Sequence, residues 1–191
     1  MNVLVIPEDS RKDKDLLKPL IEAMMVELGK PRARVRVCEK PVLGGVGEAL
    51  KWERIFESLD RYVTDLFLLI VDRDGERNSG RRETLTGIEA RCAAVLGEGQ
   101  ALLGEHAIEE AEVWVLAGHD LPQGWAWRDI RAHLNPKEAY FSTFLTAHRG
   151  LSDDAAGRSI LARQAASNFR RICSRCPEDV GRRMNRVRMR I

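Results

Sequence analysis

The chain of 191 residues lacks any long apolar run. A membrane-spanning helix needs about 18 or more consecutive apolar residues, and no window of the sequence approaches that length. Cysteine is also scarce, because four residues are too few for the disulfide scaffold of a small secreted protein. The first residues lack the basic segment and long apolar core of a secretory signal peptide. We therefore expect no contact with a membrane, reduced thiols and a location in the cytoplasm.

The sequence also lacks a complete nucleotide-binding loop. Residues 44–47 read Gly-Gly-Val-Gly, but they have neither the Lys-Ser/Thr pair of a P-loop nor the full GxGxxG pattern. Cys173 and Cys176 form one CxxC motif without a second pair, so we expect neutral thiols in a helix rather than a zinc site. From this chain alone we expect no NTPase activity.

Positive charge is concentrated at the end of the chain. The net charge is +2, but residues 1–150 hold 21 basic and 25 acidic residues, whereas residues 151–191 hold 10 basic and 4 acidic ones. The last stretch contains five arginines: Arg182, Arg183, Arg186, Arg188 and Arg190. The planar guanidinium group of arginine binds phosphate and carboxylate groups well. This tail therefore predicts contact with nucleic acid or with an acidic protein. The alternative is a solvated helix end, whose apolar residues Met184, Val187 and Ile191 pack against the preceding helices.

Hydrophobic patterning predicts alternating strands and helices over the first 120 residues. Strands are expected at 3–6, 32–37, 65–72 and, weakly, 101–108, where Gly104, Glu105 and His106 interrupt the apolar run. Helices are expected at 17–28, 50–62, 83–96 and 109–116. This order predicts an α/β fold with a mainly parallel sheet flanked by helices on both faces.

Beyond Gly118 the pattern indicates helices only. We therefore expect two parts. Residues 1–120 form an α/β catalytic domain, and residues 121–191 form an α-helical C-terminal extension that carries the arginine-rich tail.

Acidic residues follow two of the predicted strands. Glu8 lies just beyond the first strand, and Asp72 and Asp74 end the most apolar one. Parallel α/β sheets bind ligands outside the carboxyl ends of their strands, and residues two apart in a strand point the same way. Such crowded carboxylates need a cation, and without a nearby His or Cys they favour Mg²⁺ or Mn²⁺. The alternative is that Asp72 caps a helix while Asp74 forms a turn.

The order of these acids resembles the Toprim domain, which topoisomerases, bacterial primases and OLD-family nucleases share. That domain has a Glu after its first strand and an Asp-x-Asp after a later one. The matching segments here are Val-Leu-Val-Ile-Pro-Glu at 3–8 and Leu-Ile-Val-Asp-Arg-Asp-Gly-Glu at 69–76. Residues 110–114, Glu-Ala-Glu-Val-Trp, are similar to a segment of small stand-alone Toprim-like proteins. The resemblance covers residues 1–120.

The resemblance implies a Mg²⁺- or Mn²⁺-dependent phosphodiesterase, in the first place a nuclease acting on DNA or RNA. It implies that Glu8, Asp72 and Asp74 are catalytic and hold one cation, with Glu8 as general base. It also implies that Glu110 and Glu112 help to hold a second cation, while Trp114 is expected to pack in the core.

Two arginines flank these acids. We expect Arg73 and Arg77 to anchor the scissile phosphate, the alternative being that they are counter-ions of the neighbouring carboxylates. The resemblance further implies a partner ATPase, as in OLD-type antiphage defence systems. The alternative function is a non-catalytic regulatory or binding subunit that keeps a vestigial Toprim site.

Overall fold

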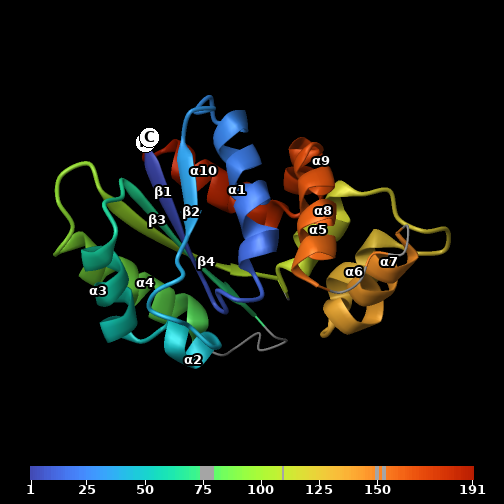
Figure 1. Ribbon diagram of the computed structural model, residues 1–191, viewed down its shortest axis with the longest axis horizontal. Helices are drawn as coiled ribbons and strands as arrows, with labels where there is room; N and C mark the ends of the chain where they lie inside the picture. Colours follow the sequence, from blue (N-terminus) through green and yellow to red (C-terminus); the bar gives the residue numbers. More distant parts are fainter. Residues whose placement is uncertain (74–79, 109, 149–150, 152–153) are drawn as a thin grey trace.

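The computed structural model describes residues 1–73, 80–108, 110–148, 151 and 154–191. Its centre is a sheet of four parallel strands in the order β2-β1-β3-β4 (Figure 1). These strands are β1 (Asn2–Pro7), β2 (Arg34–Val37), β3 (Leu66–Asp72) and β4 (Ala101–Ala107). The sequence prediction of a mainly parallel α/β sheet followed by a helical C-terminal region is confirmed.

Side chains alternate between the two faces of the sheet and build two separate cores. On one face, Val3, Val5 and Leu68 pack with helix α1 (Lys14–Glu27) and with helices of the C-terminal region. On the other face, Leu4 and Phe67 pack with residues of the three helices that follow β2 and β3. These helices are α2 (Val46–Ala49), α3 (Trp52–Arg61) and α4 (Arg81–Ala93). Both central strands therefore consist almost entirely of apolar residues, because each of their faces is covered.

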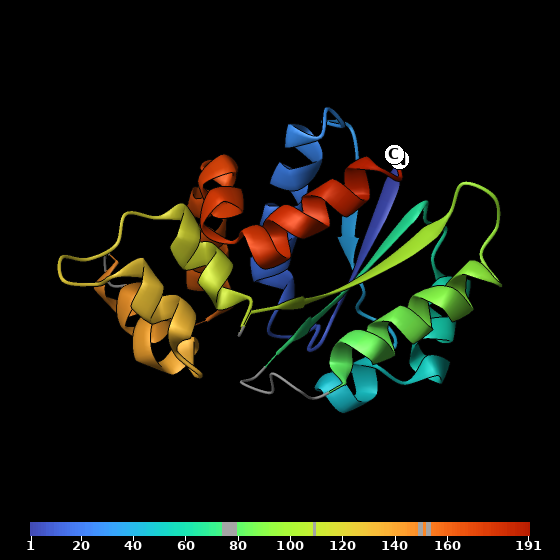
Figure 2. The same cartoon turned by 180° about the vertical axis from the view of Figure 1, so that it is seen from behind.

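The C-terminal region is helical and packs against α1 and the sheet (Figure 2). It is preceded by α5 (Glu112–Gly118), which follows β4, and its elements before residue 155 are α6 (Trp127–Ala132), the π-helical turn η1 (Lys137–Phe141) and α7 (Ser142–Ala147). The others are α8 (Ala155–Ala166), α9 (Phe169–Arg175), the π-helical turn η2 (Pro177–Gly181) and α10 (Arg182–Arg188). The division at residue 120 stays a prediction.

Helices α5 and α8 touch at a glycine. A Cβ atom built on Gly118 would lie 2.6 Å from both the Cα and the Cβ of Ala165. Only a glycine lets the two backbones approach this closely, since the opposing atoms belong to backbone or to a methyl group that has no room to move. This contact places α8 directly against α5, the helix that begins at Glu112.

Two local expectations differ from the structure. The helix expected at 17–28 begins three residues earlier, at Lys14, so Pro19 lies inside it. Strand β4 is a full seven-residue strand rather than a weak one. The charged residue Glu105 is accommodated there, although it is 1% exposed, because arginines from two helices surround it. No helix among the described residues is long and apolar enough to cross a membrane.

Candidate active site at the carboxyl edge of the sheet

Glu8 and Asp72 meet where the two central strands end. Strands β1 and β3 are neighbours in register, which places their carboxyl ends at one edge of the sheet. The backbone N–H of Asp72 donates to Oε2 of Glu8 at 3.0 Å. The structure thus brings together two of the three acids that the sequence places in one site.

The residues that follow Asp72 are described only in part. The backbone N–H of Arg73 donates to the carbonyl of Ala107 at 3.1 Å, which extends the pairing of β3 with β4 by one residue. Asp74 and Arg77 lie outside the described residues, so their roles as metal ligand and phosphate anchor remain predictions, as does that of Arg73. The guanidinium of Arg81 donates to the carbonyl of Asp72.

The segment between β4 and α5 reaches the same edge. The backbone N–H of Ala111 donates to Oδ1 of Asp72 at 3.0 Å. Ala111 separates Glu110 and Glu112, the two acids that the sequence assigns to the site. A chain of direct contacts therefore runs from Glu8 through Asp72 to the Glu-x-Glu segment.

Glu112 is a buried, ion-paired carboxylate. Its Oε1 lies 2.6 Å from Nη2 of Arg158 on α8 and 3.2 Å from Nζ of Lys137 on η1, and its side chain is 3% exposed. Burial alone would raise the pKa of Glu112, but these two cations outweigh burial and lower it. Glu112 is therefore ionised at neutral pH and holds Arg158 and Lys137 in place.

Glu110 has a different environment, although it is only two residues away. Its Oε2 accepts a hydrogen bond from the backbone N–H of Lys137 at 2.7 Å. Burial, followed by the charges of Glu112 and Glu138, raises the pKa of Glu110 to about 7. A carboxyl group with such a pKa releases and takes up its proton near neutral pH. A cation bound nearby would stabilise its ionised form.

The sequence analysis missed a further acid, Asp13, just before α1. Its Oδ2 accepts a hydrogen bond from the backbone N–H of Asp9 at 3.0 Å. Burial, together with the charges of Glu112 and Glu8, raises the pKa of Asp13 to about 7, while the hydrogen bond and Arg158 oppose the rise. Asp13 therefore belongs electrostatically to the same acidic site. Nothing local in the sequence separates it from the other charged residues of its loop.

The donor chemistry of this edge suits a hard cation. The two acids that meet there, Glu8 and Asp72, offer carboxylate oxygens, and ligands of this kind favour Mg²⁺ or Mn²⁺ over Zn²⁺. Among the described residues, however, no three His, Cys, Asp or Glu side chains are placed to hold a metal ion together. The described carboxylates fit the ion by their chemistry, and Asp74 is the predicted ligand still to be placed.

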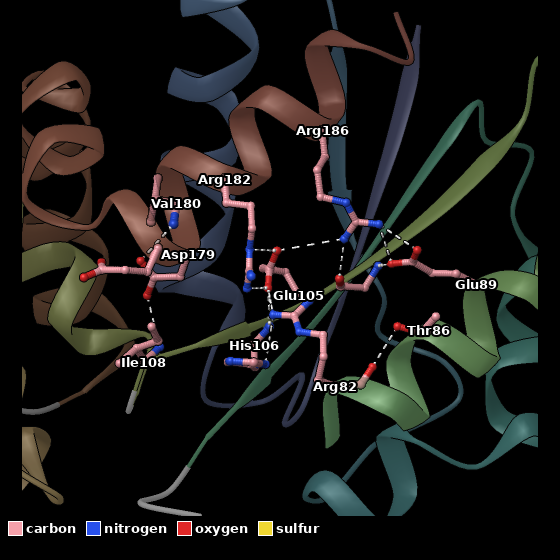
Figure 3. A network of polar contacts seen from close by, with 12 residues as sticks. Arg82, Thr86, Glu89, Glu105, His106, Ile108, Asp179, Val180, Arg182 and Arg186 are labelled. Atoms are coloured by element: carbon pink, nitrogen blue, oxygen red, sulfur yellow. Dashed lines mark hydrogen bonds and ion pairs between the residues drawn. The ribbon is translucent and has the colours of Figure 1, made fainter. Parts of the chain in front are cut away.

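The arginine-rich tail forms α10, which lies beside the edge strand β4 (Figure 3). Arg182 donates from Nε and Nη2 to the two carboxylate oxygens of Glu105, at 3.1 and 2.6 Å. Arg82 of α4 donates to Glu105 as well and lies 3.1 Å from Nδ1 of His106. Burial would raise the pKa of Glu105, yet the arginines lower it overall. Burial and the charge of Arg82 lower the pKa of His106 to about 4.

The remaining tail arginines have unequal surroundings. Arg183 is 2% exposed, and its guanidinium carbon lies 4.5 Å from the ring centroid of Trp114. Arg186 is paired with Glu89, and Arg188 donates to Asn185 on its own helix at 3.0 Å. Arg190 is exposed. Three of the five arginines therefore stabilise the fold, as Val187 does by complete burial, and binding of nucleic acid by the tail remains a prediction.

Comparison of the chain with models of protein families, with curated proteins and with solved structures finds no match.

Proposed function

We propose that the protein is a Mg²⁺- or Mn²⁺-dependent phosphodiesterase of Toprim type, acting as a nuclease. The observation that carries this proposal is the contact chain from Glu8 to Asp72 and on to Ala111, at the edge where parallel sheets bind ligands. Three segments far apart in the sequence converge there in the order that the resemblance requires.

Each residue has a role in this proposal. Glu8, Asp72 and Asp74 hold one divalent cation, and Glu110 contributes a further carboxylate. When bound there, the metal supplies an activated water and neutralises charge on the leaving oxygen of a phosphodiester. Glu112 contributes indirectly, because its ion pairs hold the side chains of Arg158 and Lys137 beside the acidic site.

Each hydrogen bond between the acids also orients a carboxylate. Glu8 uses Oε2 to accept from the backbone of Asp72, and Asp72 uses Oδ1 to accept from Ala111. Backbone donors do not rotate as side chains do, so both carboxylates are pre-organised before any ligand arrives. The proposed location in the cytoplasm rests on the sequence, and the partner ATPase rests on the resemblance alone.

A cleavage assay on plasmid DNA, single-stranded DNA and RNA tests the proposal. We expect cleavage with Mg²⁺ or Mn²⁺, none with EDTA, and a loss of at least a hundredfold in Glu8→Gln and Asp72→Asn. Both substitutions keep the acceptor atom of the native hydrogen bond. Asp65→Asn is the matched control, since Asp65 precedes the same strand β3 at its other end and binds the backbone of Asn2. Equal activity in all four proteins would refute the proposal.

The second candidate is the non-catalytic binding subunit. It is favoured by the internal pairing of Glu112 and by the lack of a three-residue metal group among the described residues. In that case, no divalent cation produces cleavage, and Asp72→Asn leaves partner or nucleic-acid binding unchanged.

A further inference from the structure

A surface pocket of about 270 Å³ lies next to the acidic site. It is bounded by the loop before α1, by the start of η1 and by the first turn of α8. Its charged lining residues are four cations and two carboxylates: Arg11, Lys12, Lys137, Arg158, Asp15 and Asp154. These six residues carry a net charge of +2 (four minus two), and the carboxylates of Glu112 and Asp9, which pair with the four cations, lie just outside the lining.

The floor of the pocket is connected to the acidic site by direct contacts. Arg158 and Lys137 both contact Oε1 of Glu112. One residue before Glu112, Ala111 binds the carboxylate of Asp72. The pocket is thus linked to Asp72 through two consecutive residues: Glu112 contacts the cations, and Ala111 binds Asp72.

The two floor cations are held rigidly. The side chain of Arg158 is 8% exposed and that of Lys137 is 28% exposed. Because the buried Glu112 fixes both, little conformational entropy is lost when they receive a second anion.

The two rim cations, in contrast, are exposed to solvent. Arg11 and Lys12 have side chains 71% and 68% exposed, and each pairs loosely with Asp9, at 3.5 and 4.0 Å. Exposed pairs of this length contribute little stability, so an incoming anion replaces them at low cost. Helix α8 also starts at this pocket, and its first turn is capped there by Asp154, whose Oδ1 accepts from the backbone N–H of Gly157 at 2.8 Å.

We propose that this pocket binds a phosphate group of the substrate strand next to the phosphate that is cut. The proposal rests on the proposed function for the identity of the substrate. Arg158 and Lys137 form the fixed floor, and Arg11 and Lys12 close over the phosphate from the rim. A strand bound in this way passes the acidic site, where one of its phosphodiesters meets Glu8 and Asp72.

The test is binding of a short, labelled single-stranded DNA in EDTA, where no cleavage occurs. The variant Arg11→Gln/Lys12→Gln removes the rim cations and leaves the buried pairs of Glu112 intact. Its matched control is Arg61→Gln/Arg128→Gln, which removes two exposed cations elsewhere, on α3 and α6. We expect the Kd of the pocket variant to rise about tenfold or more, and the log-log salt slope to fall by about 1 to 2. The control should stay within about twofold of wild type.

Inorganic phosphate is the second probe. If the pocket recognises the phosphate group, millimolar phosphate competes with the DNA in wild type and competes less in the pocket variant. If it instead needs a longer strand, phosphate does not compete, while the variant still loses DNA affinity. Both results support the proposal, and they separate a single-phosphate site from an extended one.

Other results overturn it. Absence of DNA binding by wild type, unchanged affinity of the pocket variant, or an equal loss in the control each shows that the pocket is not a phosphate site. Failure of the nuclease proposal is recognised separately, by the absence of metal-dependent cleavage while DNA binding still depends on Arg11 and Lys12. If wild type cleaves with metal but the pocket variant binds DNA as tightly as wild type, the phosphate pocket is refuted and the nuclease proposal stands.

Discussion

Arg186 of α10 holds Glu89 of α4 by two hydrogen bonds, from Nη2 to the two carboxylate oxygens at 2.8 and 2.6 Å. The pair lies across the outer edge of β4, as Figure 3 shows. Oε1 of Glu89 accepts from the backbone N–H of Gly104 at 2.6 Å. Nη1 of Arg186 donates to the backbone carbonyl of the same Gly104 at 2.8 Å. An ion pair thus occupies backbone groups that a neighbouring strand would otherwise bind, which protects the sheet edge from pairing with another chain.

Replacing Arg186 tests this role. We expect Arg186→Ala to lower the free energy of unfolding by about 1–3 kcal/mol, because it removes the charged partner of Glu89 and of the Gly104 carbonyl in a partly buried place. Chemical unfolding measures the decrease, and size-exclusion chromatography shows whether the uncovered edge promotes association. Arg188→Ala on the same helix is the control, and equal effects of the two would contradict the edge-capping role.

A second prediction concerns the contact of α5 with α8. Gly118→Ala places a methyl group 2.6 Å from backbone and side-chain carbon atoms of Ala165. Overpacking of this kind costs about 1–3 kcal/mol, and the rigid backbone on both sides favours the upper end. Gly87→Ala on α4 is the opposite case, since its Cβ meets nothing within 4 Å, and it should add about 0.5–1 kcal/mol. Thermal unfolding of both variants distinguishes the contact from a general effect of glycine.

The pKa of Asp13 makes stability depend on pH. The folded protein raises this pKa from 3.8 to about 7, chiefly by burial, so between these values the folded state keeps a proton that the unfolded chain has released. Stability therefore falls as pH rises through that window. Asp13→Asn keeps an acceptor for the backbone of Asp9 and carries no charge. We expect its stability relative to wild type to rise by about 2 kcal/mol between pH 5 and pH 8, in chemical unfolding with EDTA. A constant difference across that range would contradict this.

The sequence predicted the sheet well because its strands are local apolar patterns. Val3 to Ile6 and Leu66 to Val71 are short apolar runs, which strands covered on both faces require. The carboxyl edge followed from them, since Glu8 and Asp72 come directly after these strands. Their meeting needed only the rule that parallel strands end together.

The partners of the acids could not be predicted in this way. Arg158 meets Glu112 from 46 residues further along the chain, through packing that no local pattern encodes. One signal was present, because Arg158 shares helical spacing with the buried Leu161, Ala162 and Ala165 and so faces the core. Similarly, Glu105 interrupts an apolar run, and the distant Arg182 is what allows it to be buried. Long-range pairing of charges is thus the information that the strand and helix patterns lack.

Binding of metal gives a prediction independent of any substrate. A ligand that binds only the folded state raises Tm by mass action. We expect millimolar Mg²⁺ or Mn²⁺ to raise the Tm of wild type by a few degrees, and the effect to vanish in Asp72→Asn but not in Asp65→Asn. A shift of the same size in all three proteins would indicate nonspecific binding of the ion and would remove the metal site from the proposal.

The last prediction concerns the tail arginines. Arg188 and Arg190 are exposed, and in the described part of the chain neither is paired with a carboxylate, in contrast to Arg182 and Arg186. Deleting residues 181–191 would remove the buried Val187 and the caps of β4, and so would confuse binding with unfolding. The informative change is therefore Arg188→Gln/Arg190→Gln, whose unfolding curve should match that of wild type.

If the tail binds phosphates, this double variant binds single-stranded DNA and RNA more weakly, and its log-log salt slope falls by about 0.7 for each phosphate that is no longer neutralised. Cleavage at saturating substrate should be kept, because neither residue touches the acidic edge. Arg61→Gln/Arg128→Gln again removes two exposed cations and serves as the control. An unaltered affinity and salt slope in a normally folded variant would show that the tail does not bind nucleic acid. In that case its exposed end, beyond the capped edge of β4, is better explained as a surface for an acidic protein.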